Sequence, residues 1–220
     1  FYRRRIKRIF PPLTIVLVTT IGLGQLILLP EDALKVAKSG LWSTFSMANV
    51  YFWLFQDTSY FATASNQLPL LHLWSLGIEE QFYIIWPFAL LLFLRSKHKK
   101  HFFAVFGLIG ILSYALAEFL FSHAPSFSYY MLPTRAGELL LGGILAQFII
   151  KKENLEIPKV AVSMISLLGT LMIIGSLFLL SENSVFPGVR ALPPTLGAAA
   201  LIFSGHYGNA APNRLLKLKP

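Results

Sequence analysis

Two adjacent carboxylates and an amide, Glu79, Glu80 and Gln81, interrupt a stretch that otherwise has the apolar character of a membrane helix. Polar groups at membrane depth are costly, and they commonly mark a binding site or a proton-transfer site. A carboxylate in such a position can act as a general acid or base, or it can orient a reacting group. Successive residues of an α-helix turn by about 100°, so the three side chains cannot all face one cavity. At least one of them is therefore expected to be structural, and the sequence leaves open which glutamate faces a reaction.

A second polar pair, Arg135 and Glu138, begins another apolar segment. Three residues apart on a helix, the two side chains can pair with each other, or Arg135 can reach a carboxylate of the first stretch across a bundle. The pair can fix helix packing, or it can form part of a polar cavity. His72 precedes the first stretch, where it could orient or transfer a proton, although an ordinary loop histidine fits equally well. No two histidines have the spacing of metal ligands on one helix face, and no metal site is predicted.

The composition is that of a membrane protein. The chain of 220 residues is 55% hydrophobic and 13% charged, and its apolar residues lie in blocks too long for a soluble core. Cysteine is absent, which excludes disulfides, thiolate metal ligands and a thiol nucleophile. Residues 41–56 are apolar and aromatic, and we expect them to be interfacial or re-entrant on the outer side. We expect an all-α, polytopic transmembrane helical bundle with about six spanning helices, at residues 11–29, 74–94, 102–121, 132–150, 160–180 and 194–203.

The net charge of +9 is carried mainly by four basic runs, each next to an apolar segment. This placement is typical of cytoplasmic flanks under the positive-inside rule, and it argues against nucleic acid as a partner. The first run contains Arg4, Arg5 and Arg8. Guanidinium groups bind phosphate through paired hydrogen bonds, so this run can bind an anionic ligand from the cytoplasm or anionic lipid headgroups.

Placing the basic runs on the inside sets the depth of the other polar residues. Glu79 and Glu80 then lie about 8 Å in from the outer end of their helix, at about 1.5 Å per residue. Arg135 and Glu138 enter their own helix from the same side. We therefore expect two separate regions, an anion site near Arg5 on the inner side and a polar cavity toward the outer side.

Several motifs carry a family resemblance. They are FYRRRIKRIFP at the start of the chain, HLWSLGIEEQFYIIWP at residues 72–87, MLPTRAGELLLG at residues 131–142 and FPGVRALPPTLG at residues 186–197. In this order they resemble the acyltransferase-3 family of integral membrane proteins, which includes bacterial O-acetyltransferases of lipopolysaccharide O-antigen and of peptidoglycan. The similarity spans nearly the whole chain.

The resemblance implies transfer of an acyl group, usually acetyl, from cytoplasmic acyl-CoA to a hydroxyl of a cell-envelope glycan. Acyl-CoA would be a donor substrate rather than a resident cofactor, and the protein would lie in the inner membrane of a bacterium, among membrane lipids. Three pairs of residues match motifs of the family. Arg5 and Arg8 match its basic motif, which is suited to the phosphates of CoA. Glu79 and Glu80 match its paired glutamates, and Arg135 and Glu138 match its later polar pair.

Members of that family normally begin with two further helices, the first carrying a histidine regarded as the catalytic base, and they continue into more spans. We therefore expect residues 1–220 to be a single partial domain, an interior fragment that is inactive alone, and His72 does not take that histidine's role. A transporter or flippase for lipid-linked or acylated metabolites is the alternative, because it too would use intramembrane charges and a helix kinked at Pro87. A non-catalytic membrane scaffold is a third possibility.

Overall fold

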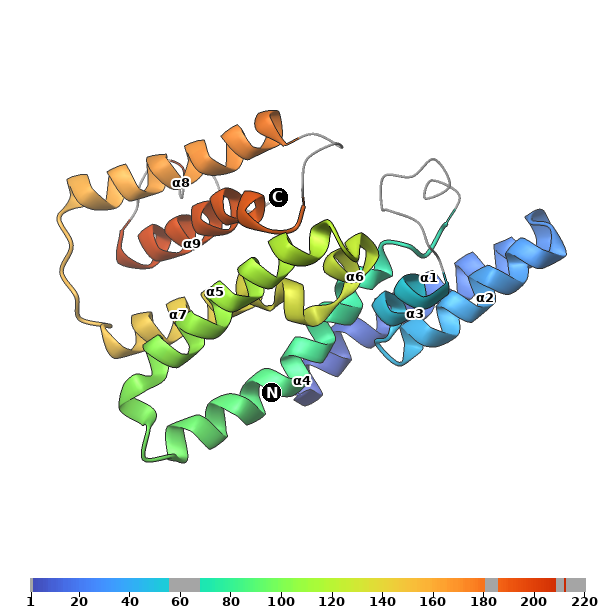
Figure 1. Cartoon of the computed structure of the whole chain (residues 1–220), viewed down its shortest axis with the longest axis horizontal. Helices are drawn as coiled ribbons and strands as arrows, with labels where there is room; N and C mark the ends of the chain where they lie inside the picture. Colours follow the sequence, from blue (N-terminus) through green and yellow to red (C-terminus); the bar gives the residue numbers. More distant parts are fainter. Residues whose placement is uncertain (1, 56–67, 181–185, 209–211, 213–220) are drawn as a thin grey trace. The chain divides into compact units, whose positions relative to one another are not determined.

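The computed structural model describes residues 2–55, 68–180, 186–208 and 212, and within these ranges every regular element is a helix (Figure 1). The all-α prediction is confirmed for this part of the chain. In chain order the elements are α1 (Tyr2–Ile27), α2 (Pro30–Thr44), α3 (Ala48–Phe55), α4 (Leu73–Arg95), the 3-10 helix η2 (Lys99–His101), α5 (Phe102–Phe121), α6 (Pro125–Tyr130), α7 (Leu132–Lys151), α8 (Lys159–Leu179), the 3-10 helix η3 (Val189–Ala191) and α9 (Leu192–Tyr207).

Four helical segments are long and apolar enough to cross a membrane: α1, α4, the continuous Lys99–Phe121 segment of η2 and α5, and α8. The other two predicted spans correspond to α7 and α9. The first turns of α7 contain Thr134, Arg135 and Glu138, which lower its hydropathy. The 16 residues of α9 rise about 24 Å, less than the roughly 30 Å of a hydrocarbon core. The count of six spans therefore stays a prediction.

Helix α1 begins earlier than the sequence predicted. The predicted span started at Pro11, whereas the helix starts at Tyr2 and runs through Pro11 and Pro12. A proline nitrogen carries no hydrogen, so the carbonyls of Lys7 and Arg8 lose their helical donors. Both of these residues are exposed, and solvent or lipid headgroups can supply the missing hydrogen bonds. The first basic run is therefore helical rather than a flank that precedes the helix.

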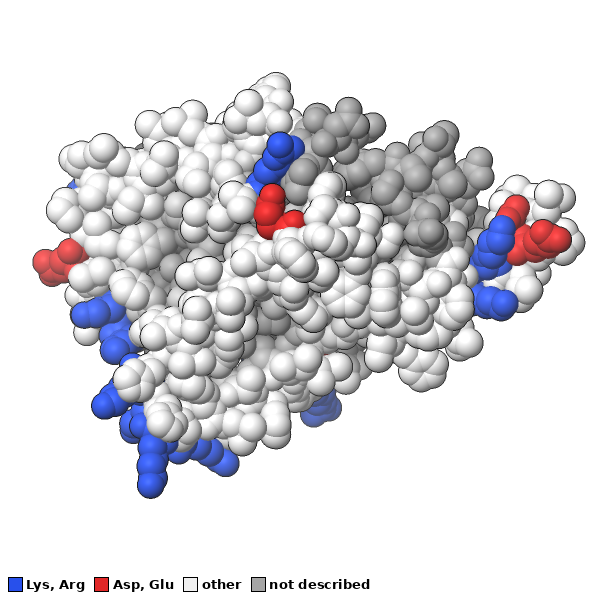
Figure 2. Space-filling view, in the orientation of Figure 1, with Lys and Arg blue, Asp and Glu red and all other residues white. Residues whose placement is uncertain are grey.

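Helix α2 was not predicted, because between the spans at residues 11–29 and 74–94 only an interfacial or re-entrant segment at residues 41–56 was expected. Pro30 starts the helix, and Glu31 and Asp32 lie in its first turn, where acidic residues are favoured. The helix folds back along α1, and Figure 2 shows charged side chains gathered at the tip of this hairpin. The segment predicted to be re-entrant contains the end of α2, a turn with Ser46 at φ 59°, and α3. Residues 56–67, which follow α3, lie outside the described residues.

The chain divides into two compact units. Unit 1 comprises residues 1–88 and 125–132, and unit 2 comprises residues 89–124 and 133–220, so α4 contributes to both. The division falls just after Pro87, which lies inside α4. Each unit has a candidate site of its own, and the two are described separately below.

An aromatic core holds unit 1 together. The ring of Trp74 in α4 packs edge-on against Tyr130 of α6 at 5.6 Å, and Phe52 of α3 lies 6.3 Å from the same tyrosine ring. Tyr130 and Phe52 are almost completely buried. The start of α4 is thus fixed against two short helices. This packing sets the orientation of Glu79, Glu80 and Gln81, which lie one to two turns further along α4.

Unit 2 contains a close helix pair. Helices α8 and α9 lie side by side (Figure 1). A Cβ atom added to Gly169 would lie 2.8 Å from the carbonyl oxygen of Gly197, and the reverse addition gives the same distance. The two backbones are therefore in near contact, as small residues permit in membrane helices.

Candidate functional site

Arg5 and Glu80 meet in unit 1, although 75 residues separate them in the chain. The Nε of Arg5 donates to an oxygen of Glu80 at 2.8 Å, and its Nη2 lies 3.8 Å from an oxygen of Glu79. The guanidinium carbon is 3.2 Å from the ring centre of Tyr83, a cation–π contact. One arginine therefore connects α1 with both glutamates and with a tyrosine one turn further along α4.

This ion pair borders a cavity of about 350 Å³. The wall is mainly apolar with a few polar groups, which is typical of small-molecule sites. Helix α1 forms one side, the last turn of α2 and the turn after it form the second, and one face of α4 forms the third. The lining residues are Tyr2, Arg5, Ile6, Ile9, Phe10, Leu13, Ser43, Thr44, Ser46, Leu73, Leu76, Gly77, Glu80, Tyr83 and Ile84.

The two glutamates differ in their position relative to this cavity. Residues 73, 76, 77, 80, 83 and 84 recur at helical spacing on one face of α4, so Glu80 lines the cavity. Glu79 lies one residue, about 100°, away from that face and is not among the lining residues. The side chain of Glu79 is 47% exposed, against 19% for Glu80.

Gln81 is the structural member of the polar triplet. Its Nε2 donates to the carbonyl of Ser46 at 2.9 Å and to Oδ1 of Asn49 at 2.8 Å. Asn49 is fully buried and donates in turn to the carbonyl of Tyr130 at 3.1 Å. The turn packs on Gly77, where an added Cβ would lie 2.9 Å from Oδ1 of Asn49. These bonds hold the α2–α3 turn against α4 and thereby form one side of the cavity.

The predicted separation between an inner anion site and an outer carboxylate cavity is wrong for Arg5 and the two glutamates. The start of α1 lies beside the middle of α4, where the hydroxyl of Tyr2 donates to the carbonyl of Ile84 at 3.0 Å. The prediction assumed that the basic run lies beyond the end of a helix starting at Pro11. Because α1 extends to Tyr2, the run instead lies along α4 and brings Arg5 to the level of Glu80.

The remaining predicted residues of this region lie outside the cavity wall. Arg4 and Arg8 are exposed on α1, and neither is among the lining residues. His72 is exposed immediately before α4, and its carbonyl accepts a hydrogen bond from Ser75 at 3.1 Å. Their functional roles stay predictions. Asn49 and Ser46 were missed by the sequence analysis, because nothing in the sequence connects them to Gln81.

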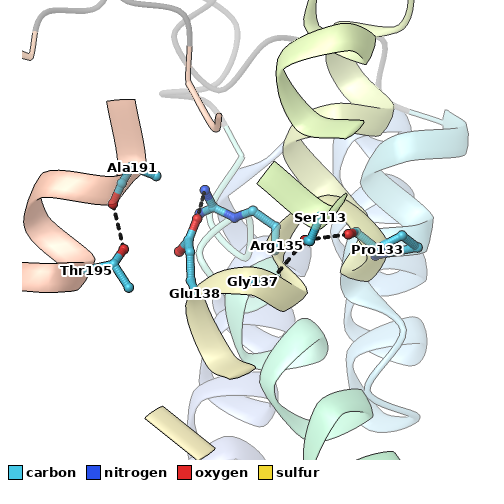
Figure 3. A network of polar contacts seen from close by, with 7 residues as sticks. All are labelled: Ser113, Pro133, Arg135, Gly137, Glu138, Ala191 and Thr195. Carbon is cyan, nitrogen blue, oxygen red and sulfur yellow. Dashed lines mark hydrogen bonds and ion pairs between the residues drawn. The ribbon is translucent and has the colours of Figure 1, made fainter. Parts of the chain in front are cut away.

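Unit 2 contains the second arginine–glutamate pair. Arg135 and Glu138 lie on the same helix, α7, with Nη1 and Oε1 3.0 Å apart, so the expected local pair is present (Figure 3). Their side chains are 13% and 25% exposed. The ring of Phe186 lies 5.1 Å from the guanidinium carbon of Arg135. Figure 3 shows Thr195 of α9 opposite the side chain of Glu138. Both pairs are partly enclosed: Arg135 is less exposed than Arg5, at 13% against 23%, and Glu138 is slightly more exposed than Glu80, at 25% against 19%.

Hydrogen bonds from α5 position the start of α7 and a nearby turn. Ser113 donates to the carbonyl of Pro133 at 2.6 Å and accepts from the backbone N–H of Gly137 at 2.9 Å (Figure 3). Glu118 accepts from the N–H of Val189 at 3.0 Å. Gly188 has φ 132°, a conformation that a side chain would disfavour, and it packs directly against Glu118. The residues beside the Arg135 pair are thus fixed by bonds to α5.

The amino-acid sequence of this chain is similar to a known protein family and to several bacterial proteins. A family model described as an acyltransferase domain matches residues 1–211. The chain is 30% identical over 217 residues to an uncharacterized protein of Haemophilus influenzae, covering 95% of this chain and 87% of that protein. It is 33% identical over 179 residues to the peptidoglycan O-acetyltransferase OatA of Listeria monocytogenes, covering 79% of this chain and 28% of OatA. Relatives in Staphylococcus aureus are 33% identical over 193 residues, and this chain spans 31% of their length. No solved structure matches.

Proposed function

We propose a reaction for this chain on the premise that it belongs to the acyltransferase family whose model it matches. Family membership confirms the acyltransferase class predicted from the sequence. In this proposal the chain is part of a bacterial integral membrane enzyme that transfers an acetyl group from acetyl-CoA to a hydroxyl of a cell-envelope glycan. The donor lies in the cytoplasm and the acceptor beyond the membrane, which makes the cytoplasmic membrane the site of the reaction.

The chemistry is the conversion of a thioester into an oxygen ester. The acceptor hydroxyl oxygen attacks the thioester carbonyl carbon, a C–O bond forms and the C–S bond breaks. Coenzyme A leaves as a thiolate and finally takes up the proton that the hydroxyl loses, so the reaction needs no other reactant. Rate enhancement requires the two substrates to be held together in the correct orientation.

The observation that carries the proposal is the ion pair between Arg5 and Glu80 at the edge of the unit 1 cavity. Arg5, with the exposed Arg4 and Arg8 on the same helix, would bind the phosphates of the donor. A phosphate that reaches the cavity would compete with Glu80 for the Arg5 guanidinium. The Glu80 carboxylate could then accept a hydrogen bond from the acceptor hydroxyl and orient it toward the thioester.

The other predicted site residues take supporting roles in this proposal. Arg135 and Glu138 would maintain the packing of unit 2, because they pair within one helix and are largely enclosed. His72 is exposed and outside the cavity wall, so no step is assigned to it. Glu79 would influence the charge near Arg5 without contacting substrate.

Peptidoglycan is the first acceptor to test, because the Listeria relative is named for it. Lipopolysaccharide is the second, because the sequence motifs resemble enzymes that modify its O-antigen. Both present sugar hydroxyls, and the proposed chemistry is the same for each.

The test compares Glu80→Gln with Glu79→Gln in the full-length protein in its native bacterium, at equal membrane levels. Acetate released from purified envelope glycan by mild base measures O-acetylation. We expect Glu80→Gln to lower acetylation about tenfold or more, since misorientation of a reacting group has costs of this order. Glu79→Gln should stay within about twofold of the wild type because Glu79 is not in the cavity wall. Normal acetylation in the Glu80→Gln strain would overturn the site assignment.

A second measurement separates transfer from transport. Membranes are given acetyl-CoA labelled in the acetyl group together with the glycan. Label bound covalently to the glycan supports the acyltransferase. Label that crosses the membrane without bonding to glycan would favour the transporter or flippase instead.

A further inference from the structure

We propose that the groove between the last turns of α4 and the first half of α5 binds an anionic phospholipid. One acyl chain would lie along the groove, and the headgroup phosphate would lie at the α4–α5 turn. All the residues concerned belong to unit 2, and none of them takes part in the acyl-transfer proposal. The inference therefore stands independently of that proposal.

The groove has a volume of about 600 Å³, and its character changes along its length. Its walls along the two helices are apolar, formed by Ala89, Leu92, Phe93, Val105, Phe106 and Ile109. At the turn the lining residues become polar, namely Ser96, His98 and His101. A lipid has the same order of parts, an apolar chain followed by a polar headgroup.

Three phenylalanine rings make the base of the groove rigid. Phe93 of α4 lies 5.2 Å from Phe106 and 6.0 Å from Phe102, and the latter two rings are 4.8 Å apart. Phe102 and Phe106 are buried. Because these contacts join α4 to α5 directly beneath the turn, the groove does not depend on a ligand to hold it open.

The turn itself is compact and strongly basic. Ser96 donates to the carbonyl of Phe93 at 2.7 Å and accepts from the N–H of His98 at 3.1 Å, which closes the turn. Around it, residues 89–117 contain no acidic residue. In the part of the chain that the structure describes, no ion pair involves the four exposed cations Arg95, Lys97, Lys99 and Lys100. Figure 2 shows blue side chains gathered over the α4–α5 turn, with no red beside them.

These two properties together favour a lipid over a soluble anion. A soluble phosphate would use only the basic turn and would leave the apolar walls unoccupied. A neutral lipid would fill the walls but gain nothing from four cations close to the headgroup, whereas an anionic headgroup is attracted by each of them. The exposed Leu92 and Ile109 leave the groove accessible from the lipid side of the helices.

The test uses the purified full chain in detergent and native mass spectrometry. Dioleoyl phosphatidylglycerol or dioleoyl phosphatidylcholine is added at equal ratios, and the lipid retained per protein is counted. We expect phosphatidylglycerol to be retained at least about fivefold more than phosphatidylcholine, since each nearby cation contributes attraction of this order. Equal retention of the two lipids would overturn the proposal.

A matched pair of variants distinguishes a site from general positive charge. Lys97→Ala/Lys99→Ala removes two charges at the α4–α5 turn beside the groove, and Lys152→Ala/Lys159→Ala removes two charges at the turn between α7 and α8. The first variant should lower phosphatidylglycerol retention about fivefold or more, and the second should leave it within about 1.5-fold. Equal losses in the two variants would show attraction by net charge alone and would refute the site.

Two further measurements address the acyl chain and the alternative ligand. Val105→Trp fills the groove without changing charge and should lower retention about threefold or more. If this variant is not monodisperse, the wild-type protein is instead given dihexanoyl phosphatidylglycerol. This lipid should be retained several-fold less than dioleoyl phosphatidylglycerol, because its acyl chains are short. Retention unaffected by groove filling or chain length would overturn the proposal. Displacement of the lipid by glycerol 3-phosphate would indicate a soluble-phosphate site and would also overturn it.

Discussion

The two arginine–glutamate pairs of this protein use the same residue types in different ways. Arg5 and Glu80 belong to two helices and meet beside a cavity. Arg135 and Glu138 are one turn apart on a single helix. The first pair exists only when α1 and α4 are correctly packed, and a ligand in the cavity can reach it. The second is set by helical geometry alone. This difference is the basis of our proposal that the first pair serves the reaction and the second serves stability.

The largest expected effect separates these two roles. Arg5→Gln should lower O-acetylation about 100-fold per folded molecule, because the donor phosphates and Glu80 both lose their partner. Arg135→Gln should act mainly on stability, lowering the free energy of unfolding by about 3 kcal/mol as Glu138 is left enclosed without its cation. Glycan acetate, normalised to the protein recovered as a monodisperse peak in gel filtration, gives the comparison. Equal losses per folded molecule would remove the distinction between the pairs.

Gly188 tests how unit 2 holds the residues around Arg135. Gly188→Ala should destabilise the protein by about 2–3 kcal/mol, because its φ of 132° disfavours a side chain and Glu118 occupies the space. Gly142→Ala is the matched control in α7, where an added Cβ meets nothing within 4 Å. That substitution should be neutral or stabilise by up to about 1 kcal/mol. Melting curves in detergent that rank the two variants the other way would refute the packing described here.

Gln81 tests the corresponding support in unit 1. Gln81→Leu removes the hydrogen bonds to Ser46 and Asn49, and it should cost about 1–3 kcal/mol because Asn49 is fully buried. Ser75→Ala serves as the control, since Ser75 is exposed and bonds only a carbonyl of its own chain segment. A melting temperature unchanged in Gln81→Leu would mean that the α2–α3 turn does not depend on this network.

The smallest effect is expected at the tip of the α1–α2 hairpin. Lys35 and Asp32 form an exposed ion pair at 2.8 Å, and Lys35→Ala should leave the melting temperature unchanged within error. The hydrogen bond and negative charge of Asp32 raise the pKa of Lys35 above its ordinary value. A raised lysine pKa stabilises at pH values below the ordinary lysine pKa, and the contribution disappears only as pH rises through the raised value. Lys35 should therefore add no pH dependence to the melting temperature near neutral pH. A melting temperature of Lys35→Ala clearly different from that of the wild type would contradict the prediction for this ion pair.

The contrast between the pairs also explains what the sequence could predict. Arg135 and Glu138 are joined by an i, i+3 spacing that is visible in the sequence, so this pairing was among the alternatives. The hydrophobic periodicity likewise indicated an all-helical membrane protein. Helical geometry also predicted that Glu79, Glu80 and Gln81 could not all face one cavity, and of the three only Glu80 is among the residues that line the unit 1 cavity.

The contact between Arg5 and Glu80 could not be predicted, because it depends on how far α1 extends and how it is staggered against α4. Two consecutive prolines suggested a helix start at Pro11, but the freed carbonyls lie on an exposed turn and the helix continues to Tyr2. Helix α2 was missed because its charged first turn resembles a loop in a membrane protein. Asn49 was missed because its partner Gln81 is distant in the chain.

The pairing of Arg5 with Glu80 is the central claim, and a double-mutant cycle tests it most directly. Arg5→Gln, Glu80→Gln and the double variant are melted in detergent together with the wild type. We predict a coupling of about 1 kcal/mol or more, so that the double variant melts close to the less stable single variant. Additive effects of the two substitutions would mean that the side chains do not interact, and the proposed site would then be wrong.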